Sequence, residues 1–336
     1  IQRTNGGTHT LNFNKASGTQ TWTQTGSFGT GALIINVGNS TTNTVQLLSN
    51  ISLGASAHTF NVTNGATFNM GPYTLSGAAS GFVLGATGAI KLGNANGIVT
   101  APTASGNVQT STRTFPATAS YFYNGTANQV TGNALPATLT TTGNLNIEAA
   151  SGVTVTLTTN NTTVPTFNLL SGLFAAGTGQ NINLSNGGVV NATGGDFATG
   201  ASAGNITTTG SAAFNGNCNP YNVYASGGVN FGAQTVSIQN GGTFRINAGG
   251  FVNTNAPYYS TGATLQYNSS ATYGRALEWS ATSGRGYPHH VQISNNTILD
   301  PANTAGAQAN TPLRTAGNLT IDSGSAMYMD FGGNNM

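Results

Sequence analysis

The chain has 336 residues, of which 4% are charged, and its formal net charge at pH 7 is +2. An ordinary soluble domain has about 25% charged residues. The eight Lys and Arg residues form no run or stripe, which argues against a basic nucleic-acid interface, and no apolar stretch approaches the ~18 residues that a membrane-spanning helix needs.

The remaining composition predicts a folded protein. Disordered chains combine low hydrophobicity with high net charge and few aromatic residues. This chain has 15 Phe and 11 Tyr, together with 48 Gly, about twice the usual share. Because Lys is rare and Asn, Thr, Ser and Gly are abundant, we expect an extracellular protein located at a cell surface or in a matrix.

Short strands are predicted along the whole chain. Apolar and polar residues alternate with a period of two, which places apolar side chains on one face. Asn-Gly and Gly-Gly pairs, typical of turns, separate these alternations. No sustained 3.6-residue apolar period indicates a helix. Clear alternations in chain order are 67–70, 154–158, 235–238 and 243–246.

One template recurs: apolar-x-apolar-x-x-Gly-x-x-apolar-x-apolar. It predicts two short strands around a glycine corner. Residues 291–299 nearly match, with Asn296 in the glycine place, and Asn also tolerates a positive φ. The four full matches are 60–70, 182–192, 236–246 and 319–329, with corner glycines at Gly65, Gly187, Gly241 and Gly324.

Repeated strand-corner-strand units predict an all-β fold, a right-handed parallel β-helix or β-solenoid with irregular coils and one or more loop excursions. One such unit cannot bury its apolar face alone, but stacked units share a continuous core. We expect one continuous solenoid over residues 1–336, of roughly 12 to 16 coils if each takes about 20 to 28 residues. The alternative is a set of antiparallel β-sandwich repeats, whose Asn-Gly turns would close ordinary hairpins.

Longer runs resemble a known family. The run "YNGTANQVTG", the following "LPAT" and the pair "NLNI…SGVTVTL" lie in residues 96–158, with further similar blocks at 60–77, 273–300 and 317–333. Together they resemble a repeat region of large secreted surface proteins of Bacteroidetes-type bacteria. The resemblance implies secretion to the cell surface, a β-helical stalk, and a role in adhesion, matrix or filament formation.

Catalytic chemistry is not predicted. Glycoside hydrolysis needs two carboxylates roughly 5 to 10 Å apart. Although distant strands of a solenoid can bring a pair together, only fold-level analogy supports an enzyme, so we expect none. The chain has six acidic residues: Glu148, Asp196, Glu278, Asp300, Asp322 and Asp330.

The densest polar cluster lies around residues 273–290, where we expect a lateral loop or insertion. A sugar-binding patch is one interpretation, combining an aromatic platform, a carboxylate and an arginine. The interpretation that we favour is a structural loop restrained by an Arg–Glu pair, with Trp279 buried. Candidate binding residues are Arg275, Glu278, Trp279, Arg285, Tyr287 and His289.

No cofactor or metal site is expected. His289 and His290 would point to opposite faces of an extended strand, and no third ligand lies nearby. Asp196 in "GGDFATG" is similar to a calcium-binding nonapeptide, but the second glycine and the tandem copies are missing. Cys218 is the single cysteine, so it forms no intrachain disulfide and no Cys-rich metal site.

The sequence therefore predicts an extracellular structural protein, a stalk or a self-assembling filament subunit. Its expected partners are further copies, stacked end to end or laterally, or further coils of a longer chain, because neither end carries a charged cap. The alternative is an adhesin module that binds a glycan or another surface. A polysaccharide-active enzyme is the third hypothesis.

Overall fold

The computed structural model describes residues 7–38, 42–100, 105–158, 162–177, 179–301 and 313–328. The chain forms two compact units. Unit 1 comprises the residues up to Val164 with Asn168–Leu173, and unit 2 comprises Pro165–Phe167 with the residues from Phe174 onwards. The described residues contain one short helix, the 3-10 helix η1 (Gly200–Ala203). No helix among them is long and apolar enough to cross a membrane.

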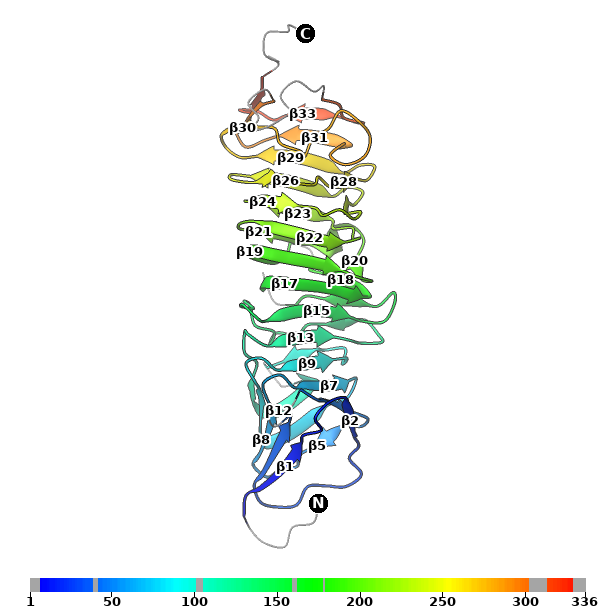
Figure 1. The fold of residues 1–336 in the computed structure, drawn as a ribbon, viewed down its shortest axis with the longest axis vertical. Helices are drawn as coiled ribbons and strands as arrows, with labels where there is room; N and C mark the ends of the chain where they lie inside the picture. The colour runs from blue at the N-terminus through cyan, green and yellow to red at the C-terminus, as the bar shows by residue number, and fades with distance from the viewer. Residues whose placement is uncertain are drawn as a thin grey trace. The chain divides into compact units, whose positions relative to one another are not determined.

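Unit 1 is built from short strands that stack in parallel ladders (Figure 1). One ladder follows the order β1-β3-β6-β8-β12, and another joins β2, β4, β7, β9, β13 and β15. An antiparallel ladder joins β10 and β11. The strands are β1 (His9–Phe13), β2 (Thr19–Trp22), β3 (Leu33–Val37), β4 (Thr44–Leu47), β5 (Ile51–Ser52), β6 (His58–Val62), β7 (Thr67–Gly71), β8 (Leu75–Leu84), β9 (Ala89–Leu92), β10 (Ile98–Val99), β11 (Ser105–Gly106), β12 (Val108–Thr114), β13 (Ser120–Tyr123), β14 (Gln129–Val130), β15 (Asn144–Glu148) and β16 (Thr154–Thr156).

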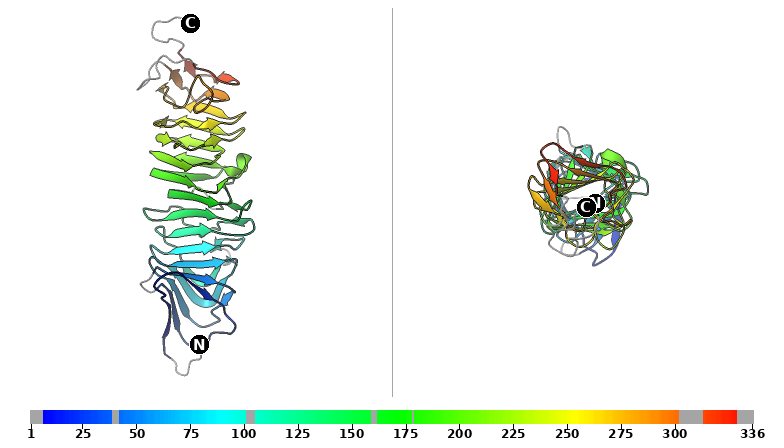
Figure 2. Two further views of the ribbon diagram at one scale, coloured as in Figure 1. Left: turned by 45° about the vertical axis from the view of Figure 1, so that its right-hand side comes forward. Right: turned by 90° about the horizontal axis from the view of Figure 1, so that it is seen from above.

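Unit 2 repeats this arrangement, as the green to orange strands of Figure 2 show. Its main parallel ladder runs β19-β21-β23-β26-β29-β31-β33, and shorter ones run β19-β22-β24-β27, β25-β28 and β30-β32-β34. The strands are β19 (Asn181–Ala192), β20 (Asp196–Phe197), β21 (Asn205–Thr208), β22 (Ala212–Gly216), β23 (Asn222–Ala225), β24 (Gly228–Asn230), β25 (Ser237–Ile238), β26 (Thr243–Asn247), β27 (Phe251–Val252), β28 (Tyr258–Tyr259), β29 (Thr264–Asn268), β30 (Thr272–Gly274), β31 (His290–Ile293), β32 (Ile298–Asp300), β33 (Leu319–Ile321) and β34 (Ala326–Met327).

Two further strands carry residues of both units: β17 (Thr162–Ser171) and β18 (Leu173–Ala175). The described parts of the chain together make about 12 turns of β-solenoid, at the lower end of the expected range. Parallel pairing at one-coil separation confirms the predicted β-solenoid and excludes the antiparallel sandwich. That one continuous solenoid spans residues 1–336 stays a prediction.

The template places its glycines at left-handed corners. Gly65, Gly187, Gly241 and Gly324 have φ values of +78°, +77°, +72° and +82°. Around Gly65 the Ala66 amide donates to the Thr63 carbonyl oxygen at 3.1 Å. A positive φ at the third residue of a four-residue turn marks a type II turn, which favours glycine.

Asn296 also follows the template. Its φ is +54° and that of Asn295 is +56°, and the Thr297 amide donates to the Ser294 carbonyl oxygen at 3.1 Å. Two consecutive positive φ values give a type I′ turn, which Asn tolerates. Three of the full matches have separate strands on both sides of the corner, as predicted. The match at 182–192 is one strand, β19, whose two halves pair with different strands, and Met329 of the last match lies outside the described residues.

The core of each unit is a stack of inward-facing side chains. In unit 1, the Phe60 ring centroid lies 6.0 Å from that of Trp22 and 5.8 Å from that of Phe82, in stacked geometry. In unit 2, Phe214 and Phe231 stack at 5.1 Å. Burying such rings removes a large apolar area from water, so the inside of the coils supplies most of the stabilisation.

The outside of the coils carries rows of side-chain amides. Asn205 donates to Asn181 at 2.7 Å and accepts from Asn222 at 2.8 Å, and these three residues form what we call the amide ladder. Unit 1 has an equivalent row, Asn12–Asn36–Asn61, with bonds of 2.8 and 2.9 Å. Each amide has both donors and an acceptor, so identical residues can pair along a whole stack.

Candidate functional site

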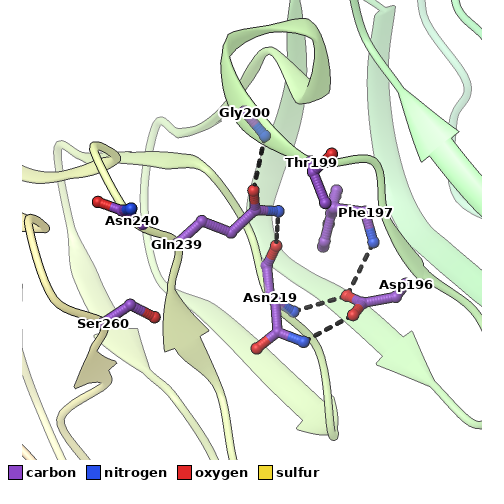
Figure 3. A pocket seen from close by; sticks show the side chains of 8 residues that line it. All are labelled: Asp196, Phe197, Thr199, Gly200, Asn219, Gln239, Asn240 and Ser260. Atoms are coloured by element: carbon purple, nitrogen blue, oxygen red, sulfur yellow. Dashed lines mark hydrogen bonds between the residues drawn. The ribbon is translucent and has the colours of Figure 1, made fainter.

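A groove on unit 2 is the first candidate site in the described parts of the chain. Its volume is about 380 Å³, within the range of small-molecule sites. Figure 3 shows its side chains, which converge from separate segments of the chain. The residues that line this groove, which we call the Asp196 groove, are Asp196, Phe197, Thr199, Gly200, Asn219, Gln239, Asn240 and Ser260.

Successive coils bring these residues together. Asp196 begins β20, Asn219 lies one coil later, Gln239 follows β25, and Ser260 follows β28. Parallel backbone bonds fix the stacking, since the Gln239 amide donates to the Pro220 carbonyl oxygen at 3.1 Å and the Ser260 amide to that of Ile238 at 2.9 Å. The groove therefore crosses four coils that are each spaced by about 4.8 Å.

The Asp196 carboxylate is held by hydrogen bonds. Oδ1 accepts from the backbone amides of Phe197 at 2.8 Å and Asn219 at 2.6 Å. Oδ2 accepts from Nδ2 of Asn219 at 2.6 Å. Bonds from amides to a carboxylate are stronger than neutral ones, so they fix Asp196 without a cation.

Gln239 fixes the other wall of the groove. Its Oε1 accepts from the Gly200 amide at 2.8 Å, and its Nε2 donates to the carbonyl oxygens of Ala198, at 2.9 Å, and of Asn219. Figure 3 shows this side chain reaching across from its own coil to the segment of Thr199 and Gly200. These bonds order the groove before any ligand arrives.

Cys218 lies next to the groove but offers no nucleophile. Its side chain is buried, and burial together with the nearby Asp196 charge raises the pKa of the thiol to about 12. The thiolate is the reactive form of cysteine. Cys218 is therefore a neutral, packed side chain at physiological pH.

The six residues predicted as a binding patch do not form one exposed surface. Arg275, Glu278 and Trp279 are 1%, 0% and 2% exposed. They belong to residues 275–289, a strand-free segment between β30 and β31 that we call the loop segment. Trp279 is buried, as in the structural interpretation of this loop. The binding role of the six residues stays a prediction.

Glu278 lies among tyrosines. Its Oε1 accepts from the Tyr267 hydroxyl at 3.2 Å and from the Ala276 amide at 2.9 Å. Its Oε2 and the Tyr273 hydroxyl are buried and have no hydrogen-bond partner among the described residues. The Arg–Glu pair that would restrain the loop stays a prediction.

Burial controls the ionisation of this cluster. Burial raises the pKa of Glu278, against the opposing effect of the hydrogen bonds from the Ala276 amide and the Tyr267 hydroxyl. Burial also raises the tyrosine pKa values, and the Glu278 charge adds to the shift at Tyr267 and Tyr273. It lowers the pKa of Arg275. Since desolvation penalises every charged form, the cluster is arranged for packing.

Arg285 and Trp279 attach the loop segment to the coils. Nη1 of Arg285 donates to the Ala256 carbonyl oxygen at 2.8 Å, and Nη2 donates to those of Ala233, at 2.8 Å, and Gln234. The indole Nε1 of Trp279 donates to the Arg314 carbonyl oxygen at 2.7 Å. These hydrogen bonds hold the loop segment against backbone carbonyl groups outside it.

His289 ends the loop segment and His290 begins β31, where it lines a second groove. Their ring centroids are 4.4 Å apart, and Nδ1 of His290 accepts from the Asn318 amide at 3.0 Å. Tyr287 is half-buried. The second groove has a volume of about 310 Å³ and is lined by Thr264, His290, Val291, Gln292, Asn318 and Thr320.

Possible metal ligands and carboxylates are dispersed. Within the described ranges no group of three or more His, Cys, Asp or Glu residues could hold a metal ion. Lys91 Nζ and Glu148 Oε2 form an ion pair at 2.6 Å on the outside of unit 1. Asp330, one of the six acidic residues, lies outside the described residues.

No family model, curated protein or solved structure matches this chain. The β-helical repeat that the sequence resemblance implies is present. The bacterial surface-protein origin stays a prediction.

Except for Asp196, the sequence reasoning missed the Asp196 groove. A usable signal was the spacing of its polar residues, because Asn219 lies 23 residues after Asp196 and Gln239 lies 20 residues after Asn219. These spacings equal one coil each. Polar residues at coil-length spacing therefore indicate a shared outer column, in the same way as apolar residues indicate the core.

Proposed function

We propose that this protein is an extracellular structural protein, a stalk segment or a filament subunit at a bacterial surface or in a matrix. The observation that carries the proposal is the repeated pairing of identical amides on the outside of consecutive coils. Such a surface needs few charges. Coils can therefore be added with little electrostatic repulsion, as a long support requires.

Two features of the chain favour the filament form of this proposal. A charge content of 4% leaves little like-charge repulsion between copies. At β33, Leu319 and Ile321 are 43% and 46% exposed, although they pair in register with the buried Val291 and Ile293. A further coil stacked on this strand would cover both side chains.

Negative-stain microscopy over a concentration series tests the proposal. We expect particles that join as concentration rises, and we expect Leu319→Lys to reduce joining because a charge would then face the added coil. Phe251→Lys, at an exposed position of β27 away from β33, is the matched control for the added charge. Separate particles at every concentration would count against a filament subunit.

An adhesin that binds a glycan is the second candidate function. The specific observation in its favour is the Asp196 groove, because its wall groups are already ordered by the solenoid. Binding sites on rigid scaffolds lose less entropy when the ligand binds. A solenoid can carry such a site and still serve as a support.

A further inference from the structure

We propose that the Asp196 groove binds a neutral oligosaccharide. The inference goes beyond the structural role and deepens the adhesin alternative by naming a site and a ligand class. It does not depend on filament formation.

The first argument is the ordered framework. Asp196 is fixed by three hydrogen bonds and Gln239 by three more. Five of these six bonds join different coils, and the sixth comes from the amide of Phe197, the residue after Asp196. The conformations of these two side chains are therefore set before a ligand binds. Preorganised polar walls lower the cost of association.

The second argument is the set of groups that remain available. The side chains of Asn240 and Thr199 make no hydrogen bond within the described residues, and the Ser260 hydroxyl pairs only with the hydroxyl of Ser237, at 3.2 Å. Figure 3 shows Asn240 and Ser260 on the opposite side of the groove from Asn219. Amides and hydroxyls both donate and accept, as sugar hydroxyls do.

The third argument concerns charge. None of the groove-lining residues is Lys or Arg, and the Asp196 carboxylate is already satisfied by amide donors. Anionic ligands are usually recognised by Arg or Lys. A sulfated, phosphorylated or uronic acid chain would meet the negative charge of Asp196 with no positive side chain in the lining, so an uncharged chain is favoured.

The fourth argument is the form of the groove. Its lining residues come from four coils, with a step of about 4.8 Å at each coil. This step is comparable to the length of one sugar residue. Phe197 contributes an apolar side chain to the lining, against which the C–H face of a sugar ring can pack. The groove thus fits a linear chain of two or three sugars better than a single compact ligand.

Binding of defined trisaccharides to the full chain tests the proposal. Cellotriose, maltotriose and chitotriose serve as neutral probes, and trigalacturonate serves as the anionic probe, with affinities measured by NMR titration. We expect at least one neutral probe to bind, and trigalacturonate to bind more weakly. We expect Asn240→Ala to lower the affinity for the neutral probe by about three- to tenfold, because the variant loses one hydrogen bond to the sugar.

Asn253→Ala is the matched control, because Asn253 is an exposed asparagine of unit 2 outside the groove. It should bind the neutral probe as the wild type does, and circular dichroism should show both variants to be folded. The proposal is overturned if no neutral probe binds, if trigalacturonate binds more tightly, or if Asn240→Ala and Asn253→Ala bind equally well. None of these results bears on assembly seen by microscopy.

Discussion

The amide ladder and the loop segment, both in unit 2, place their polar groups in opposite ways. In the amide ladder Asn181, Asn205 and Asn222 lie outside, where each pairs with its equivalent on the next coil. In the loop segment Arg275 and Glu278 lie inside, at 1% and 0% exposure. The ladder tolerates water at every position, whereas the loop segment depends on complete packing.

This comparison shows at which positions a substitution should lower the free energy of unfolding most. A surface hydrogen bond that is lost can be replaced by water, so its net contribution is small. A buried ring or carboxylate has no such replacement. The predictions below test the contrast in order of decreasing effect.

Trp279→Ala should have the largest effect. The ring is 2% exposed, its centroid lies 6.2 Å from that of Tyr267, and its indole nitrogen is bonded to Arg314. We expect a loss of about 3–5 kcal/mol in the free energy of unfolding, measured by urea denaturation with circular dichroism. Tyr328→Ala, at a side chain that is 51% exposed, is the control, and an equal loss in both variants would contradict the account.

Glu278 should make stability depend on pH. Because its pKa is raised in the folded state, the folded protein holds a proton that the unfolded chain releases above about pH 4.3. Stability from this group is therefore present at low pH and falls as pH rises towards the folded-state pKa. For this single group, the free energy of unfolding changes by at most about 1.4 kcal/mol per pH unit.

Glu278→Gln tests this pH dependence. The glutamine keeps the shape of the protonated acid but cannot ionise. We expect the variant to lose less stability than the wild type as pH rises from 4 to 8 in parallel urea titrations. Identical pH dependence of stability in both proteins would contradict a raised folded-state pKa of Glu278.

Gly65→Ala should have an intermediate effect. The φ of Gly65 is +78°, and an added Cβ would meet only Thr42 Cγ2 at 3.5 Å, so backbone strain is the main cost. We expect a loss of about 1–2 kcal/mol in the free energy of unfolding, measured by thermal denaturation. A Cβ at Gly29 would meet open space, and Gly29 has no positive φ, so Gly29→Ala should leave the free energy of unfolding unchanged. A similar loss in Gly29→Ala would contradict the explanation by backbone strain at the Gly65 corner.

Asn205→Ala should have the smallest effect. It removes the bonds to Asn181 and Asn222, and water can reach the groups left behind. We expect a loss of about 0.5–1.5 kcal/mol in urea denaturation, against no measurable loss for Asn253→Ala. A loss as large as that of Trp279→Ala would mean that the amide ladder, and not the core, supplies most of the stability of the coils.

The same contrast explains what the sequence could predict. Corners such as Gly65 and Asn296 follow from local turn chemistry, and the core follows from period-two alternation, so both were predicted. The burial of Glu278 depends on tyrosines from separate strands, which local patterns do not reveal. The Asp196 groove depends on which coils become neighbours, and irregular coil lengths hide that register.

The central claim is that the parallel coils are a rigid framework on which the groove and the loop segment depend. Hydrogen exchange measured by mass spectrometry tests this claim most directly. We expect the slowest exchange in β23, β26 and β29, whose amides pair with adjacent coils, and faster exchange at 280–285, which has no ladder. Exchange in these three strands as fast as in the loop segment would contradict the claim.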